Sequence, residues 1–185
     1  MATDTRTRMV YGAAQMLGAR GVGGLSLRDL AKEAGVPIGS TYHHFPGGRQ
    51  QLIEEAVRTI GAAINRRLLV SRERGPVAAL DAFGEEWRSL LESTEFTTGC
   101  PVFAVATGDD AELRSVATEV LASWQQTLTD LMTEASIDAA RAPRLALFVV
   151  ASVEGAIALC RAEQSIAPLR DTMDEIHLLI EGALP

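Results

Sequence analysis

Cysteine and histidine are scarce in this chain of 185 residues, which contains two cysteines and three histidines. Cys100 and Cys160 stand far apart and belong to no C-x-x-C pair, so neither a zinc ribbon nor a disulfide framework is expected. The chain is long enough to bury a core without such staples. We therefore expect no metal, no cofactor and a reducing compartment.

Strand patterns and long hydrophobic runs are also lacking. No segment alternates β-branched and polar residues, whereas Ala, Leu, Glu and Arg recur at helical spacing, which predicts an all-α fold. The longest apolar run, LALFVVASVEGAIALC, is broken by Glu154 and predicts a buried helix rather than a membrane span. The charged first residues do not resemble a signal peptide, so we expect a cytoplasmic protein without a membrane partner.

Positive charge is in short supply overall but is unevenly distributed. The net charge is −7, yet residues 1–60 contain seven Lys/Arg against five Asp/Glu, a balance of +2, which leaves −9 for the rest. A mildly basic head on an acidic body can bind a polyanion through the head while the body is repelled.

Helical periodicity and the positions of proline and glycine predict the helices and a division into two domains. A long helix beginning at about Arg49 is expected to connect an N-terminal domain, residues 1–48, to a second domain, residues 49–185. The other predicted helices span about 4–18, 26–34, 37–45, 76–93, 101–107, 109–135, 141–162 and 168–183.

Two short helices joined by a glycine turn predict a helix-turn-helix. Ser26 can cap the first helix, Asp29 holds the capping-box position, and Leu25 with Leu30 can form a hydrophobic staple. Gly35 can take the left-handed conformation that ends this helix. In such a motif the second helix enters the major groove. Polar and aromatic residues on that second helix suit phosphates and base edges: Ser40, Thr41, Tyr42, His43 and His44.

The segment SLRDLAKEAGVPIGSTYHHFP, residues 26–46, resembles the TetR family of bacterial repressors. The resemblance implies phosphate contacts from Ser26, Tyr42, His44 and Arg49. It also implies that Arg28, Gly39, Ser40 and Thr41 lie at the major groove, with Arg28 placed to bind guanine. Pro37 and Ile38 depart from the polar residues frequent in the family. The stretch GCPVFAVA, residues 99–106, resembles the C-terminal domains of a subgroup that includes drug-efflux and flavonoid-responsive repressors.

The second domain offers candidates for a ligand pocket and a dimer interface. Large apolar side chains either fill the core or line an apolar pocket: Phe83, Trp87, Phe103, Trp124, Leu128 and Phe148. Small and apolar residues on the last two helices could pack against a second chain or within their own: Ala146, Val149, Ala151, Val153, Gly155, Ala156, Ile157, Ile176, Leu179 and Ile180. Phe45 and Cys160 are expected in the core.

Together these patterns predict a ligand-responsive repressor that binds double-stranded DNA at a palindromic operator as a homodimer. A small, largely apolar effector would release it. The alternative keeps the DNA-binding head but gives the body a protein-docking role and no effector. An enzyme with Cys100 as nucleophile is disfavoured, because the sequence shows no base beside it and no phosphate-binding or triad motif.

Overall fold

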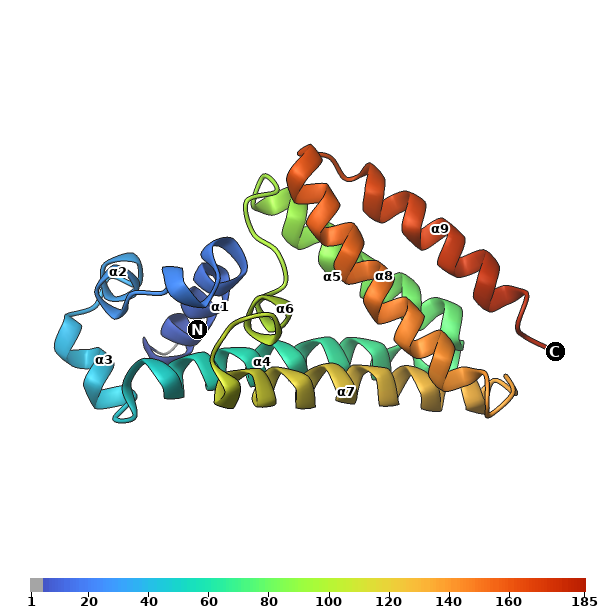
Figure 1. Ribbon diagram of the computed structural model, residues 1–185, viewed down its shortest axis with the longest axis horizontal. Helices are drawn as coiled ribbons and strands as arrows, with labels where there is room; N and C mark the ends of the chain where they lie inside the picture. Colours follow the sequence, from blue (N-terminus) through green and yellow to red (C-terminus); the bar gives the residue numbers. More distant parts are fainter. Residues whose placement is uncertain (1–4) are drawn as a thin grey trace. The chain divides into compact units, whose positions relative to one another are not determined.

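The computed structural model describes residues 5–185, and these residues form helices and loops without a strand. The predicted all-α class is therefore confirmed (Figure 1). The α-helices are α1 Thr5–Arg20, α2 Leu27–Glu33, α3 Ile38–His44, α4 Gly48–Val70, α5 Pro76–Ser93, α6 Pro101–Ala106, α7 Ala111–Glu134, α8 Ala142–Glu163 and α9 Ala167–Glu181. Two single 3₁₀ turns, η1 Val22–Gly24 and η2 Arg72–Arg74, were not predicted.

The chain divides into two compact units. The head unit comprises Met1–Gly61 and Cys100–Val120, and the body unit comprises Ala62–Gly99 and Leu121–Pro185. Both α4 and α7 contribute residues to each unit. Segment 101–107, predicted in the second domain, belongs to the head unit as α6. The division into a DNA-binding domain 1–48 and a domain 49–185 stays a prediction about function.

In the head unit, α1 provides the buried surface on which α2 and α6 pack. The predicted apolar face of this helix is fully confirmed, since Val10, Ala13, Ala14 and Leu17 are all buried. Its predicted first residue, Asp4, lies outside the described residues. Gly12 lies at this contact, and a Cβ there would lie 2.8 Å from Leu30 Cδ1, so the leucine side chain would have to shift. The contact fixes α2 closely against α1.

In the body unit, α8 packs against α9 and α5, as the orange, red and green ribbons of Figure 1 show. By length and composition α8 could cross a membrane, but half of its most apolar window is buried within the protein. Glu154 in the middle of the helix is buried too. The burial supports the expected core helix.

The connector helix α4 is held to α7 by polar contacts in both units. In the head unit, Arg58 Nη1 lies 3.0 Å from Glu119 Oε2. In the body unit, Asn65 Nδ2 donates to Ser123 Oγ over 2.5 Å. Both contacts are exposed to solvent, so each contributes little to stability by itself.

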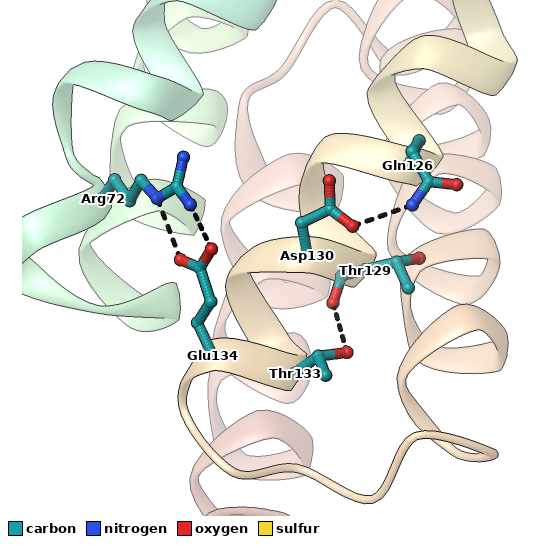
Figure 2. A network of polar contacts seen from close by, with 6 residues as sticks. All are labelled: Arg72, Gln126, Thr129, Asp130, Thr133 and Glu134. Carbon is teal, nitrogen blue, oxygen red and sulfur yellow. Dashed lines mark hydrogen bonds and ion pairs between the residues drawn. The ribbon is translucent and has the colours of Figure 1, made fainter.

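The chain after α4 is also anchored to α7. Figure 2 shows the Arg72 guanidinium of η2 donating through two nitrogens to the carboxylate of Glu134. The hydrogen bond and the negative charge of Glu134 raise the pKa of Arg72 above its ordinary value. Within α7, Gln126 Nε2 donates to Asp130 Oδ1 at 2.8 Å, and the Thr133 hydroxyl donates to the Thr129 carbonyl, also at 2.8 Å. These bonds fix the end of α7 that receives Arg72.

Candidate functional site

The helix-turn-helix begins with a side-chain cap, as predicted. The Asp29 amide donates to Ser26 Oγ over 3.3 Å, and both Leu25 and Leu30 are buried. Gly35 has φ +65°, the left-handed conformation that favours glycine at the end of α2. The Val36 amide then donates to the Ala31 carbonyl over 2.9 Å, which closes the turn. The cap and the glycine turn thus shape the connection between α2 and α3.

Burial defines the inner and outer faces of α3. Thr41 and Phe45 are fully buried, one helical turn apart. On the outer face, Ile38 is 46% exposed and Tyr42 is 60% exposed, and His43 is exposed as well. Pro37 precedes the helix without a side-chain cap. The short helix thus turns an apolar and aromatic face to solvent.

Thr41 has to be removed from the predicted DNA-contacting residues. Its side chain is 0% exposed, so it cannot reach a base or a phosphate in this conformation. The helix packs through Thr41 and Phe45, and polarity alone did not reveal which side was inward. The other predicted residues of α3 keep an accessible position: Gly39 and His43 are exposed, and Ser40 and His44 are half-buried.

The two arginines of the predicted site differ in their surroundings. Arg28 on α2 is exposed, and within residues 5–185 its guanidinium makes no hydrogen bond or ion pair. Arg49, by contrast, donates from Nε to the Leu25 carbonyl over 2.9 Å and from Nη2 to the Val22 carbonyl. Its guanidinium thus holds η1 and the start of α2 against α4. Arg49 therefore has a positioning role within the fold, and its expected phosphate contact stays a prediction.

Arg6 is a residue of the site region that the sequence analysis missed. Its guanidinium carbon lies 5.3 Å from the centroid of the Phe45 ring, within cation–π range, and its Nη2 lies 2.5 Å from Glu55 Oε2. These contacts connect α1 to the end of α3 and to α4. No local pattern indicates them, because the partners are distant in sequence.

Four of the six predicted pocket residues are buried in the body unit. The rings of Phe83, Trp87 and Trp124 meet edge to face, with centroids 6.1 to 6.3 Å apart, and Leu128 lies one turn beyond Trp124. The Trp87 indole nitrogen is buried without a hydrogen-bond partner among the described residues. A buried indole N–H usually has one.

The other two predicted pocket residues lie elsewhere. Phe103 is 41% exposed on α6 of the head unit, and Phe148 is 48% exposed on α8. Because α8 is apolar on several sides, periodicity could not tell its solvent face from its core face. Neither phenylalanine belongs to the aromatic cluster formed by Phe83, Trp87 and Trp124.

The exposed side of α8 carries an apolar stripe, defined by Leu147, Phe148, Ala151, Gly155, Ala158 and Leu159. Leu147 and Leu159 are 54% and 53% exposed. A Cβ at Gly155 would meet nothing within 4 Å. Most residues predicted at a dimer interface are instead buried within the chain, which corrects their assignment: Ala146, Val149, Val153, Ala156, Ile157, Ile176 and Ile180.

Neither cysteine has the surroundings of a catalytic thiol. Cys100 is buried, and its Sγ accepts the Phe103 amide at the start of α6. Cys160 is fully buried as predicted, and burial raises the pKa of its thiol. Within the described residues, no group of three His, Cys, Asp or Glu is placed to hold a metal ion.

Comparisons with known proteins agree with this architecture. Residues 10–56 match the tetR family of bacterial regulatory proteins, and residues 76–175 match the LmrA/YxaF-like C-terminal domain of transcriptional regulators.

Individual relatives match over nearly the whole chain. An uncharacterised HTH-type transcriptional regulator of Mycobacterium tuberculosis is 32% identical over 188 residues, covering 97% of this chain and 96% of that protein. The HTH-type transcriptional regulator LmrA of Bacillus subtilis is 30% identical over 171 residues, with 90% and 91% coverage. The crystal structure of a TetR regulator from Chloroflexus aurantiacus superposes with a TM-score of 0.78 at 27% identity, with 97% and 96% coverage. The chain therefore belongs to the TetR family of transcriptional regulators and is not an enzyme.

Proposed function

We propose that this regulator is a cytoplasmic repressor that binds a palindromic operator as a homodimer and is released by a small, largely apolar effector. The single observation that carries DNA binding is the exposed outer face of α3 together with an exposed Arg28 whose guanidinium makes no hydrogen bond or ion pair within residues 5–185. A recognition helix needs such an unoccupied face to enter the major groove.

The DNA contacts follow from accessibility. Arg28 is the base-reading candidate, since a bidentate arginine pairs with guanine O6 and N7. Tyr42 and His44 donate to phosphates. Ser26 does so through its hydroxyl hydrogen, because its oxygen already accepts the Asp29 amide. Gly39, Ser40 and His43 complete the surface that approaches the duplex.

A homodimer is supported by the apolar stripe of α8. Exposed contiguous apolar surface on a helix is typical of an interface. Gly155 has open space around it and no positive φ, so the fold does not require a glycine there. Helix interiors disfavour glycine by about 0.5–1 kcal/mol relative to alanine, which a close approach of a second α8 would offset. Two-fold symmetry would bring the same stripe from each chain together.

An effector site is supported by the aromatic cluster. A buried donor without a partner costs roughly 1–3 kcal/mol, so the Trp87 N–H favours a ligand that brings a hydrogen-bond acceptor. The three rings pack on one another, so a flat, apolar molecule would have to part them to reach this N–H. Binding that favours one orientation of α4 over another would change DNA affinity by its differential free energy. Typical couplings of about 1–3 kcal/mol correspond to roughly 5- to 150-fold.

Genomic selection tests the DNA-binding proposal. Purified protein is mixed with fragmented genomic DNA of the source at near-physiological salt, and the retained fragments are sequenced. We expect an enriched palindrome with half-sites about one helical turn, roughly 34–36 Å, apart. Retention no better than that of random DNA by the folded protein would contradict the proposal.

In the alternative function, the body unit binds a protein and takes no effector. Thermal stabilisation by small molecules distinguishes the two. A compound that binds the native state raises the melting temperature. Planar apolar compounds that carry a carbonyl should stabilise the wild type. Trp87→Phe should weaken their binding about 2- to 12-fold, the value of one hydrogen bond, and should leave analogues without the carbonyl unaffected. Absence of stabilisation across a broad panel would favour the docking role.

A further inference from the structure

The outer face of α3 is poor in the side chains that usually read bases. With Thr41 and Phe45 buried, its accessible residues are Ile38, Gly39, Tyr42 and His43, with Ser40 and His44 half-buried. The helix contains no Arg, Lys, Asn or Gln, the residues that make bidentate contacts to guanine or adenine. If α3 recognises bases, it therefore does so largely through apolar contacts and shape complementarity.

Ile38 is the side chain placed for such a contact. It is the first residue of α3, and the N-terminal residues of a recognition helix are those that meet base edges. Nearly half of this branched apolar side chain is exposed. The head unit therefore leaves apolar surface of Ile38 that a binding partner can bury. The apolar group that a base pair presents in the major groove is the C5 methyl of thymine.

Gly39 allows a duplex to come close to Ile38. A Cβ at this position would meet no atom within 4 Å, and the glycine has no positive φ, so neither packing nor backbone conformation requires it. Glycine in a helix nevertheless destabilises the helix relative to alanine. A glycine next to the exposed Ile38 would let the base edges of the major groove approach the α3 backbone closely.

We propose that Ile38 determines operator specificity by packing against the C5 methyl of one thymine in each half-site. The proposal rests on the proposed function, because it assumes that α3 enters the major groove. It adds the chemistry of the base that α3 reads and separates this reading from that of Arg28, which selects guanine.

Uracil substitution tests the contact at the level of one methyl group. In an operator obtained by genomic selection, each thymine of a half-site is replaced in turn by uracil, which pairs identically and lacks only the methyl. Burying one such group corresponds to about fourfold in affinity. We expect wild-type protein to bind about fourfold more weakly at one substituted position, measured by fluorescence anisotropy.

The variants Ile38→Ala and Lys32→Ala complete the test. Ile38→Ala should bind the thymine operator more weakly and should no longer distinguish thymine from uracil at that position. Lys32→Ala, an exposed change on the neighbouring helix α2, should keep the full preference. Equal binding of all uracil operators by wild type, or an unchanged preference in Ile38→Ala, would overturn the inference while leaving DNA binding intact. Failure of wild type to select any operator would instead overturn the proposed function and this inference with it.

Discussion

Glycines on the outer faces of α3 and α8 have open space around them, whereas glycines in the packed faces of α1 and α4 are crowded by neighbouring side chains. Gly12 on α1 and Gly61 on α4 are crowded, since a Cβ would press on Leu30 in the first case and overlap Val120 in the second. Gly39 and Gly155 have open space. The first pair serves the fold itself.

The second pair is best explained by contacts outside the chain. Each open glycine stands among exposed apolar side chains, Ile38 and Tyr42 on α3 and the stripe on α8. An open glycine among exposed apolar side chains, as at these two positions, leaves room for the close approach of another molecule. On α3 we assign DNA to this surface, and on α8 a second copy of the chain.

The largest expected effect comes from Gly155→Arg. A charged side chain in the middle of the apolar stripe should prevent dimerisation without straining the monomer, because the position is open. Losing the second head should lower operator affinity by about 100-fold or more, the usual scale of avidity. Sedimentation and operator binding measure both effects. Ala122→Arg, on an exposed position of α7, should leave the dimer and its affinity unchanged.

The next effect concerns Arg28. Arg28→Ala should cost about 1–3 kcal/mol of operator binding and should relax the preference at one base pair, because the exposed guanidinium is free of hydrogen bonds and ion pairs among residues 5–185. Selection from a randomised operator library reports both changes. Lys32→Ala on the same helix serves as control. An equal loss on operator and random DNA would mean that Arg28 only touches phosphate.

The next prediction concerns Arg49, which stabilises the fold of the head unit, in contrast to Arg28, which is proposed to contact a base. Arg49→Ala removes the hydrogen bonds to the Leu25 and Val22 carbonyls, so it should lower thermal stability as well as DNA affinity. We expect a loss of about 1–3 kcal/mol in the free energy of unfolding, since two part-buried hydrogen bonds between α4 and the start of the helix-turn-helix are lost. Unchanged unfolding with weakened DNA binding would contradict the positioning role and leave the phosphate contact as the function of Arg49.

A smaller effect tests the crowded glycines. Gly61→Ala should destabilise the protein by about 1–3 kcal/mol, because the added methyl overlaps Val120. Gly155→Ala should stabilise the isolated chain by up to about 1 kcal/mol. Denaturant unfolding at low protein concentration measures whether the free energy of unfolding falls in Gly61→Ala and rises in Gly155→Ala. If both shift stability in the same direction, the distinction between crowded and open glycines fails.

The sequence predicts the helices closely because their ends are marked locally. The segment 76–93 was predicted and α5 spans Pro76–Ser93, since Pro76 starts a helix well and Gly75 can adopt φ +88°. Likewise, Ser26 and Gly35 mark the two ends of α2. Such signals depend on neighbours in the chain and need no tertiary structure.

Faces and long-range contacts were harder to predict. Thr41 is polar yet buried, because the seven-residue helix α3 packs through the side that holds Phe45. Arg49 binds carbonyls of residues more than twenty positions earlier, which no local pattern marks. Phe148 lies on a helix whose apolar residues surround the axis, so its exposure depends on where α5 and α9 pack.

The claim that open glycines face other molecules is tested most directly by the operator affinity of Gly39→Ala, compared with its unfolding free energy. The account predicts that the variant is as stable as wild type or more stable, by up to about 1 kcal/mol, and binds its operator with about 1–3 kcal/mol less free energy. Equal or better operator binding by the stabilised variant would show that DNA does not approach α3 at Gly39 and would contradict the account.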